Sequence, residues 1–266
     1  AEPVFASVTD VLKELAPTCD DAIYVLYPKK IEEAAGAFLA ACPGDALYAV
    51  KANPNPAVLQ TLWNAGVRSF DVASMRELEL VAGLFPTAHL YVMHPVKSRG
   101  FIRRAYALGV RNFSFDDAWE LEKILTETDH ADDLHLHLRL APPATNAVMP
   151  LHGKFGVDAK EGAKLLRLAR AHVAGLGVCF HVGSQSMDAS GYDAAIRFAR
   201  RVVNAAGVEI DSIDIGGGFA ASYPGMPAPA FTDYFDAIKG SLAENGFAEL
   251  PLLAEPGRAL VAEAAP

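Results

Sequence analysis

The sequence predicts an α/β protein built as a barrel of eight parallel strands, each followed by a helix. Three observations predict it: short apolar runs recur, segments of helical period lie between them, and 266 residues is the usual size of one such barrel. Strict alternation forces parallel pairing, and eight units close into a (β/α)8 TIM barrel more naturally than they form an open sheet. A doubly wound sheet remains the alternative, because one sequence gives the strand number only to within about one or two.

Local signals predict each element in turn. Residues 7–15 have the period of a short helix, residues 22–26 form an apolar run typical of a strand, and the alanine-rich stretch 31–41 predicts a helix that Pro43-Gly44 ends. Ser74, followed by Glu77, and Asp116 are side chains that cap helix starts. The barrel strands are predicted at residues 46–50, 67–72, 89–93, 110–115, 134–140, 176–182, 212–215 and 252–255, and the helices between them at 56–65, 74–84, 98–108, 116–126, 158–173, 192–205 and 231–245.

The last predicted strand lies close to the end of the chain. A helix begins at Arg258, and the sequence stops at Pro266 after hardly two turns. We therefore expect a barrel truncated near its last helix, without the seal that this helix provides. The chain divides into a lead-in at residues 1–27 and a barrel domain at residues 28–266.

Composition limits the function classes. The chain is 52% hydrophobic and 21% charged, with a net charge of -9, which describes a soluble globular protein and argues against general affinity for nucleic acid or anionic membranes. No apolar run of about 18 residues could span a bilayer, and the start lacks the features of a signal peptide, so we expect a cytoplasmic protein. Three widely spaced cysteines, Cys19, Cys42 and Cys179, suggest packing residues rather than disulfides or a metal site.

One lysine stands where a buried strand ends. The run Leu47-Tyr48-Ala49-Val50 leads into Lys51, and the Asn53-Pro54 that follows cannot continue a strand. Poor solvation at such a position lowers the pKa of an ammonium group and frees an amine able to form a Schiff base with a carbonyl compound. A surface lysine that snorkels at a strand end is the commoner explanation of a lone lysine.

Other polar residues also follow predicted strands. In a barrel, functional residues lie at the C-terminal ends of the strands, so we expect these side chains to converge on one rim. They are Asp71, His94, Arg139, His181 with Ser184, the triplet Gly216, Gly217 and Gly218, and Glu255 with Gly257 and Arg258.

The glycine triplet is a candidate phosphate site. Consecutive glycines let the backbone approach a ligand closely and turn its N–H groups toward an anion. Arg258 would add a bidentate charge and Ser184 a hydroxyl group. The triplet is not G-x-G-x-x-G, so a dinucleotide site is poorly supported, and a flexible loop explains a bare glycine triplet about as well.

A phosphate site and a Schiff-base lysine on one rim indicate pyridoxal 5′-phosphate. Glu255 would face the pyridine nitrogen and keep it protonated, and His181 would stack on the ring. Taken singly, Glu255 is better explained as an ion-pair partner of Arg258 or Lys51, and His181 as a core histidine. Their coincidence with Lys51 favours the cofactor.

Two further segments lie near the predicted rim. His135, His137 and Arg139 share one face of a strand, but no third ligand accompanies the histidines, so a metal pair is poorly supported and Arg139 is the residue expected to reach a ligand. The Pro- and Ala-rich segment 141–153 is a candidate lid over the barrel mouth, or else a solvated loop.

With these residues in place, the chain resembles the fold-type III pyridoxal-phosphate decarboxylases, the family of the ornithine, diaminopimelate and biosynthetic arginine decarboxylases, which are related in fold to alanine racemase. The motifs come in the family's order and cover nearly the whole chain. They are Tyr48-Ala49-Val50-Lys51-Ala52-Asn53, Phe70-Asp71-Val72-Ala73-Ser74, Lys154-Phe155-Gly156, His181-Val182-Gly183-Ser184-Gln185, Asp214-Ile215-Gly216-Gly217-Gly218-Phe219 and Glu255-Pro256-Gly257-Arg258.

The resemblance implies a role for each rim residue. Lys51 would carry the covalent link to the cofactor, His181 would stack against its ring, and Glu255 would bind the pyridine nitrogen; these three are the expected catalytic residues. The other expected cofactor-binding residues are Ser184, Gly216, Gly217, Gly218, Gly257 and Arg258 at the phosphate, and Asp71 and Arg139 near the lysine.

The resemblance also implies a substrate class. Tyr223-Pro224-Gly225-Met226 and the short segment from Arg139 to Lys154 are more similar to the bacterial ornithine or ornithine/lysine decarboxylases than to the diaminopimelate enzymes. We expect decarboxylation of L-ornithine to putrescine, a step of polyamine biosynthesis, with lysine and diaminopimelate as alternative substrates.

Family members continue into a C-terminal β-domain that completes the partner's active site in a homodimer with a cysteine and an acidic residue. That domain is missing from the 266 residues, and Cys179, inside a predicted strand, does not replace the cysteine. If these residues are the entire protein, we expect weak cofactor binding and poor decarboxylation, whereas a full-length parent would be an active homodimer.

Two other function classes remain open. A non-catalytic pyridoxal-phosphate carrier would release cofactor to acceptor enzymes without amino-acid turnover. A Schiff-base aldolase without cofactor would also use a barrel lysine and a phosphate loop, but it leaves Glu255 and His181 unexplained.

Overall fold

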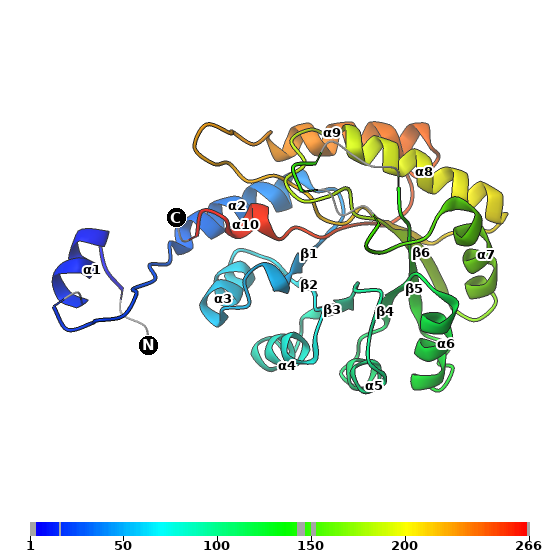
Figure 1. Cartoon of the computed structure of the whole chain (residues 1–266), viewed down its shortest axis with the longest axis horizontal. Helices are drawn as coiled ribbons and strands as arrows, with labels where there is room; N and C mark the ends of the chain where they lie inside the picture. Colours follow the sequence, from blue (N-terminus) through cyan, green and yellow to red (C-terminus); the bar gives the residue numbers. More distant parts are fainter. Residues whose placement is uncertain (1–3, 16, 143–146, 150–152, 265–266) are drawn as a thin grey trace.

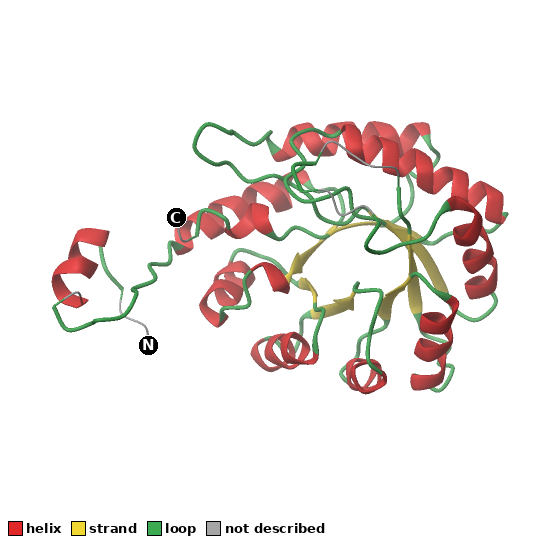
Figure 2. Cartoon of the chain, viewed as in Figure 1, coloured by secondary structure: helices red, strands yellow, loops and turns green. Residues whose placement is uncertain are grey.

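The computed structural model describes residues 4–15, 17–142, 147–149 and 153–264. Eight short parallel strands form a closed barrel in sequence order, enclosed by helices (Figure 1, Figure 2). Pairing of β1 with β8, in the register Ala46 to Ala254, excludes the open doubly wound sheet and confirms the predicted fold class. The strands are β1 (Asp45–Ala49), β2 (Ser69–Asp71), β3 (His89–Val92), β4 (Asn112–Phe115), β5 (His135–Arg139), β6 (Gly175–Cys179), β7 (Ser212–Asp214) and β8 (Leu252–Ala254).

Helices alternate with the strands as predicted, and most begin at a capping side chain. Ser74 Oγ accepts the Glu77 N–H at 3.3 Å, as expected. The predicted cap Asp116 is wrong, because Asp117 caps the next helix and Asp116 instead accepts the Gly156 N–H at 2.8 Å. The helices are α1 (Val8–Leu15), α2 (Pro28–Ala41), α3 (Pro56–Asn64), α4 (Met75–Leu84), α5 (Arg99–Ala107), α6 (Ala118–Glu127), α7 (Ala159–Arg170), α8 (Ser190–Ala206), α9 (Phe231–Glu244) and α10 (Arg258–Val261), with a 3-10 turn, η1 (Val50–Ala52), after β1.

The helical ring is sealed by a helix that precedes the barrel. The α2 helix packs against α3, α9 and α10, so it fills the gap between the first and last helices of the ring (Figure 1). The Tyr27 N–H, just before α2, donates to the Ala264 carbonyl oxygen at 2.8 Å and ties this helix to the segment after α10. The expectation of a barrel without its last seal is therefore wrong, because α2 takes that place.

The lead-in forms less regular structure than predicted. Helix α1 is present and stands apart from the barrel in Figure 1. No strand forms at residues 22–26, and the Tyr24 side chain is 90% exposed. An apolar run becomes a strand only where another strand can pair with it, and a closed barrel offers no free edge.

The core has an outer and an inner layer. The outer layer lies between the helices and the strands, whereas Leu47, Met93, Cys179 and Leu253 fill the barrel interior. Cys179 packs as predicted, but Cys19 is exposed and does not. Because apolar side chains fill the middle of the barrel, the polar residues of the strand ends are left at its mouth.

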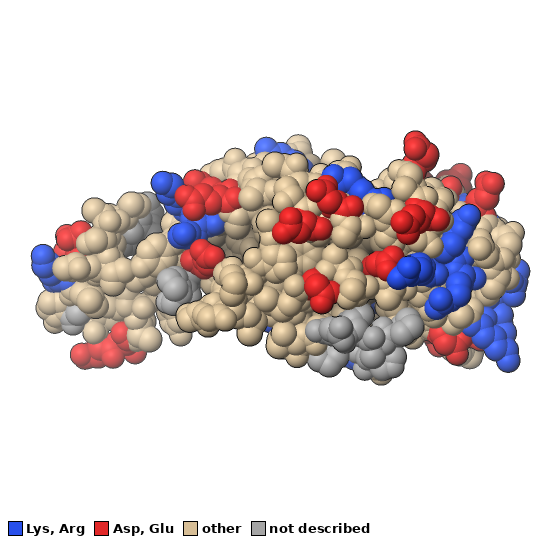
Figure 3. Space-filling view, turned by 90° about the horizontal axis from the view of Figure 1, so that it is seen from above, with Lys and Arg blue, Asp and Glu red and all other residues tan. Residues whose placement is uncertain are grey.

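The surface carries charges of both signs. On the face drawn in Figure 3, acidic and basic side chains are interspersed, and the basic ones gather toward one end. No helix in the described ranges has the length and apolar character needed to cross a bilayer.

Candidate active site

The Lys51 side chain lies at the barrel mouth beside a buried carboxylate. Its Nζ atom is 3.2 Å from Asp71 Oδ2, while Asp71 Oδ1 accepts the Met93 N–H at 3.0 Å. The Asp71 side chain is 1% exposed, so the carboxylate is held in place, whereas the Lys51 side chain is 54% exposed. Tyr48 Oη donates to the Asn53 carbonyl oxygen at 3.1 Å and fixes the turn that presents the lysine.

The direction of the Lys51 pKa differs from the sequence-based expectation. The Asp71 charge raises the pKa above its ordinary value, desolvation opposes this effect, and the Glu255 charge adds to it. The expected lowering by poor solvation is wrong, because carboxylates line this strand end. Lys51 is therefore a cation held at a fixed position beside Asp71.

The His181 imidazole is held neutral just beyond β6. Its Nδ1 accepts the Gly183 N–H at 3.0 Å, so the proton of the neutral ring is on Nε2. Desolvation lowers the pKa of His181 to about 3, and the charges of Arg139 and Lys51 act in the same direction. His181 thus presents an uncharged ring to the mouth.

The glycine triplet forms a close-packed loop after β7. Gly216 and Gly218 have φ of 68° and 111°, in the left-handed region that favours glycine. The Gly216 N–H donates to Asp214 Oδ1 at 2.8 Å, and its carbonyl oxygen accepts the Glu255 N–H at 2.8 Å. A Cβ atom on Gly217 would lie 2.7 Å from the Glu255 carbonyl oxygen and 3.2 Å from His181 Nε2. Among the described residues, no acceptor takes the N–H groups of Gly217 and Gly218.

The residue after the triplet anchors the loop in the core. Phe219 is buried, with its ring centroid 5.0 Å from that of Phe38 on α2 and 5.3 Å from that of Tyr192 on α8. Tyr192 Oη also donates to the Gly217 carbonyl oxygen at 3.0 Å. These contacts fix the loop, so the structure does not favour the flexible-loop interpretation of the triplet.

Arg258 lies where α10 begins, facing the loop after β6. Its Nε donates to Ser184 Oγ at 3.2 Å, and its Nη1 donates to Tyr223 Oη at 2.9 Å. Gly257 permits close packing here, since a Cβ atom on it would lie 3.2 Å from the Ala52 Cβ. Arg258, Ser184 and the triplet thus gather donors at one side of the mouth.

Two carboxyl groups lie beneath this mouth on neighbouring strands. Asp214, at the end of β7, is fully buried, and Glu255, one residue after β8, is 3% exposed. Asp214 Oδ2 and Glu255 Oε1 are buried and have no hydrogen-bond partner in the described part of the chain. Glu255 forms no ion pair there with Lys51 or Arg258, so the alternative explanation of this residue is not supported.

Arg139, the last residue of β5, shares this space. It pairs with Cys179, the last residue of β6, so it lies at the same end of the barrel as the residues that follow that strand. The closed parallel barrel therefore places all of the predicted site residues at or after the C-terminal ends of its strands: Lys51, Asp71, Arg139, His181, Ser184, Gly216, Gly217, Gly218, Glu255, Gly257 and Arg258.

Other predicted rim features behave differently. His137 points into the barrel, where its Nε2 lies 3.3 Å from Asn112 Oδ1, and His94 binds its own loop through the Val96 N–H at 3.1 Å. No group of three or more His, Cys, Asp or Glu side chains able to hold a metal occurs in the described ranges. The candidate lid 141–153 lies partly outside the described residues, but Met149 pairs with Ser184 in both directions, at 2.9 and 3.1 Å.

Sequence reasoning assigned no role to Gln185, which locks two loops of the site together. Its Nε2 donates to the Ala221 carbonyl oxygen at 2.6 Å, and its Oε1 accepts the Ala221 N–H at 3.1 Å. Gln185 has φ of 58°, a backbone conformation that residues other than glycine rarely adopt. Only its place in the His181-Val182-Gly183-Ser184-Gln185 motif could have indicated it.

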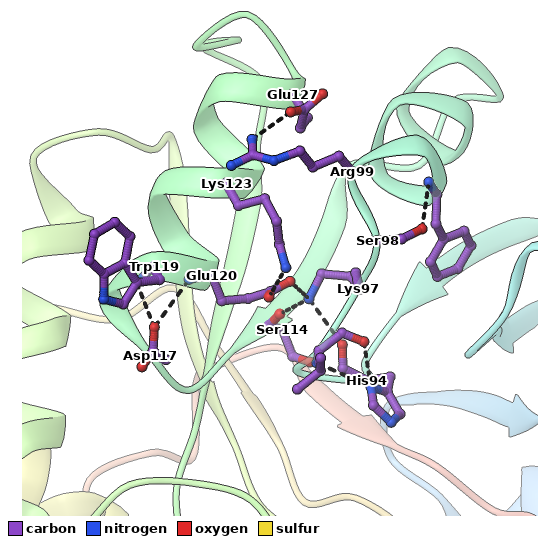
Figure 4. Close-up of polar contacts among 12 residues, drawn as sticks. His94, Lys97, Ser98, Arg99, Ser114, Asp117, Trp119, Glu120, Lys123 and Glu127 are labelled. Atoms are coloured by element: carbon purple, nitrogen blue, oxygen red, sulfur yellow. Dashed lines mark hydrogen bonds and ion pairs between the residues drawn. The ribbon is translucent and has the colours of Figure 1, made fainter.

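A buried lysine supports the β3 side of the rim. Lys97 Nζ donates to the carbonyl oxygens of His94 and Ser114, at 3.0 and 2.5 Å, and lies 3.0 Å from Glu120 Oε1 (Figure 4). Lys123 Nζ also contacts Glu120, at 2.5 Å. Lys97 thereby ties the loop that carries His94 to β4 and α6.

Replacing Lys97 by methionine is expected to lower the free energy of unfolding by about 2–4 kcal/mol, because two carbonyl groups lose a donor and Glu120 loses a cation. Desolvation lowers the pKa of Lys97 to about 8, against 10.5 for an exposed lysine. Between these pH values Lys97 binds a proton in the unfolded chain but not in the folded one, so the free energy of unfolding of the wild type should increase as the pH rises. The variant should not show this increase. Urea unfolding measured across this range tests both effects.

Lys123→Met is the matched control, because it removes the other cation beside Glu120 while leaving the carbonyl contacts in place. It should cost less than Lys97→Met and keep the pH dependence. Equal stabilities of the Lys97→Met variant and the wild type would contradict a structural role for Lys97.

Comparison with known proteins identifies the family. Residues 28–262 match the family model described as pyridoxal-dependent decarboxylase, pyridoxal binding domain. The chain is 38% identical over 177 residues to the lysine/ornithine decarboxylase of Selenomonas ruminantium, covering 65% of this chain and 44% of that protein. It is 35% identical over 220 residues to the ornithine decarboxylase of Schizosaccharomyces pombe, covering 80% and 48%. The chain thus spans about half the length of these curated relatives.

Solved structures give the same result for the fold. The lysine decarboxylase of Selenomonas ruminantium superposes with a TM-score of 0.82 at 30% identity, covering 96% of this chain and 68% of that one. The lysine/ornithine decarboxylase of Vibrio vulnificus complexed with putrescine superposes with a TM-score of 0.81 at 29% identity, covering 98% and 70%. With barrel, mouth and relatives in agreement, the chain belongs to the pyridoxal-dependent decarboxylase family, and residues 28–262 are its pyridoxal-binding domain.

Proposed function

We propose that the barrel mouth binds pyridoxal 5′-phosphate and that the protein decarboxylates a basic amino acid, L-ornithine, to putrescine. The observation that carries this proposal is the convergence, at one mouth, of a fixed lysine, a glycine cradle and a buried carboxyl oxygen without a partner. The named relatives, ornithine and lysine/ornithine decarboxylases, support the substrate class.

The residues fit each part of this cofactor. Glu255 Oε1 is buried and has no hydrogen-bond partner among the described residues, so it could contact the ring nitrogen. The N–H groups of Gly217 and Gly218, with Arg258 and Ser184, suit a phosphate group. Lys51 suits the aldehyde, and the neutral His181 suits the ring face.

When bound, pyridoxal phosphate supplies an aldehyde that condenses with amines and a ring that withdraws electrons from the substrate Cα. The chain's own residues prepare this chemistry. Asp71 Oδ2, 3.2 Å from Lys51 Nζ, holds the lysine at the mouth as a cation, which must lose one proton to give the neutral amine required of a nucleophile. His181 is held by Gly183 in one orientation, and Glu255 offers a carboxyl oxygen where the ring nitrogen would lie.

The decisive test supplies the full-length natural protein with pyridoxal phosphate and carboxyl-labelled ornithine, lysine or diaminopimelate. We expect labelled carbon dioxide and putrescine from ornithine at the highest kcat/KM. Preference for another of the three amino acids would overturn the substrate assignment. Cofactor bound without turnover of any of them would overturn decarboxylation and favour a carrier.

We also propose that the protein is a homodimer working in the cytoplasm. Apolar side chains flank Arg258 at the mouth, with Met149 and Tyr223 49% and 41% exposed, which suits a surface covered by a partner. The three free cysteines suit a reducing compartment. Light scattering that gives the monomer mass for the full-length protein would contradict the dimer.

A further inference from the structure

The proposed site contains a second buried carboxyl group for which no cofactor contact is expected. Asp214 is fully buried at the end of β7, and its Oδ1 already accepts the Gly216 N–H at 2.8 Å. Its Oδ2 has no partner among the described residues, and Glu255 Oε1 is in the same state. Two buried carboxyl groups on adjacent strands, each with an oxygen that lacks a donor, require an explanation, since each lost hydrogen bond is costly.

The strand register brings the two groups together. Asp214 pairs with Leu253, and Glu255 follows two residues later, so both point inward at the same end of adjacent strands. The register therefore sets the two side chains next to each other on the inner face of adjacent strands, each with a buried oxygen that no donor satisfies among the described residues. Two carboxyl groups can share a hydrogen bond only when one of them carries a proton.

The charges around the pair favour one retained proton. Asp71, Asp214 and Glu255 would carry three negative charges when ionised, against the positive charges of Lys51 and Arg139. Cys179 and Tyr91 also face this space, and burial raises the pKa of each, that of Tyr91 to about 12, so both are neutral. One proton retained on the pair removes the repulsion between Asp214 and Glu255 and reduces the excess of negative charge.

The titration directions agree with this geometry. Burial raises the pKa of Asp214 to about 6 and raises that of Glu255 well above its ordinary value, with the Asp214 charge as the next cause for Glu255. Geometry distinguishes the two members. The Gly216 N–H stabilises the ionised form of Asp214, whereas no donor reaches Glu255 Oε1 among the described residues, so we assign the shared proton to Glu255 and its acceptor to Asp214.

We propose that Asp214 is a positioning residue that shares one proton with Glu255 in the cofactor-free protein and keeps that proton available at the site of the ring nitrogen. On ring binding, the O–H bond of Glu255 breaks, an N–H bond forms at the ring nitrogen, and both carboxylates become ionised with no other reactant involved. This step rests on the proposed function, but the shared proton itself does not.

The first test uses infrared difference spectra of the cofactor-free protein at neutral pH. A buried protonated carboxyl should give a carboxylic-acid C=O band that disappears in both Asp214→Asn and Glu255→Gln, because either amide can donate to the remaining carboxylate and removes the need for the proton. In Asp214→Asn the amide oxygen would still accept the Gly216 N–H, so the loop is preserved. Persistence of the band in either variant would overturn the sharing.

Asp211→Asn is the matched control. Asp211 lies three residues before Asp214, but its carboxylate accepts hydrogen bonds from Arg170 at 2.6 Å and the Leu176 N–H at 2.8 Å, so it needs no proton. This variant should keep the band. Its loss there would show that the band does not come from the pair.

The second test counts protons by titration calorimetry with pyridoxal phosphate in two buffers of different ionisation enthalpy. Asp214→Asn should take up about one more proton from the buffer than the wild type at the same pH, because its Glu255 holds none to give. Equal proton counts would overturn the delivery of the proton to the ring. Absence of binding heat in the wild type would instead contradict the proposed function and leave the infrared result standing.

Discussion

Replacing Lys51 by alanine is expected to abolish covalent attachment of pyridoxal phosphate and to lower kcat/KM by roughly 10³-fold or more, because in the described part of the chain no other lysine follows β1 beside Asp71, where the nucleophile is required. The contact between Lys51 Nζ and Asp71 Oδ2, at 3.2 Å, holds this side chain in one position at the barrel mouth. The measurement is borohydride reduction of the protein with bound pyridoxal phosphate, followed by peptide mapping.

The matched control for this prediction is Lys164→Ala, which removes an exposed lysine paired with Glu161 on the α7 helix. It should leave both the labelled peptide and kcat/KM unchanged. A wild-type yield of adduct in the Lys51→Ala protein, or label scattered over surface lysines in the wild type, would show that Lys51 is not the point of attachment.

The barrel could be predicted from sequence because each strand is a short apolar run that must be buried on both faces. The eight predicted strands all occur, within about two or three residues at their ends. The same signal misled at residues 22–26, because an apolar run does not reveal whether a partner strand exists. It also could not show that α2, which precedes the first strand, seals the ring beside the last one.

The site was predictable as a set of positions, because the ends of parallel strands must meet at one mouth. Its electrostatics were not. The pKa of Lys51 depends chiefly on Asp71, which is twenty residues away along the chain. The two members of the buried carboxyl pair, Asp214 and Glu255, are separated by an even longer stretch of sequence. A sequence shows which groups reach the rim, but whether an ammonium group meets a carboxylate or an apolar wall depends on the barrel register.

Gly217→Ala is expected to weaken pyridoxal-phosphate binding by about 10- to 100-fold, corresponding to the 1–3 kcal/mol of an overpacked buried site. The added methyl group would lie 2.7 Å from the Glu255 carbonyl oxygen, which is backbone, and 3.2 Å from His181 Nε2. Neither neighbour can yield freely, because the Glu255 N–H is bonded to Gly216 and the imidazole to Gly183. Equilibrium binding followed by protein fluorescence measures the loss.

Gly240→Ala is the control for this last change, since it makes the same substitution within α9, where an added Cβ meets no atom within 4 Å. Alanine is favoured over glycine inside a helix by about 1 kcal/mol, so this variant should unfold at a slightly higher temperature and bind the cofactor normally. The opposite effects of one methyl group at the two positions would separate the geometry of the cradle from the general properties of glycine. Normal binding by Gly217→Ala would mean that the cofactor does not depend on the close approach of the loop, and the phosphate would then have to be assigned to Arg258 and Ser184 alone.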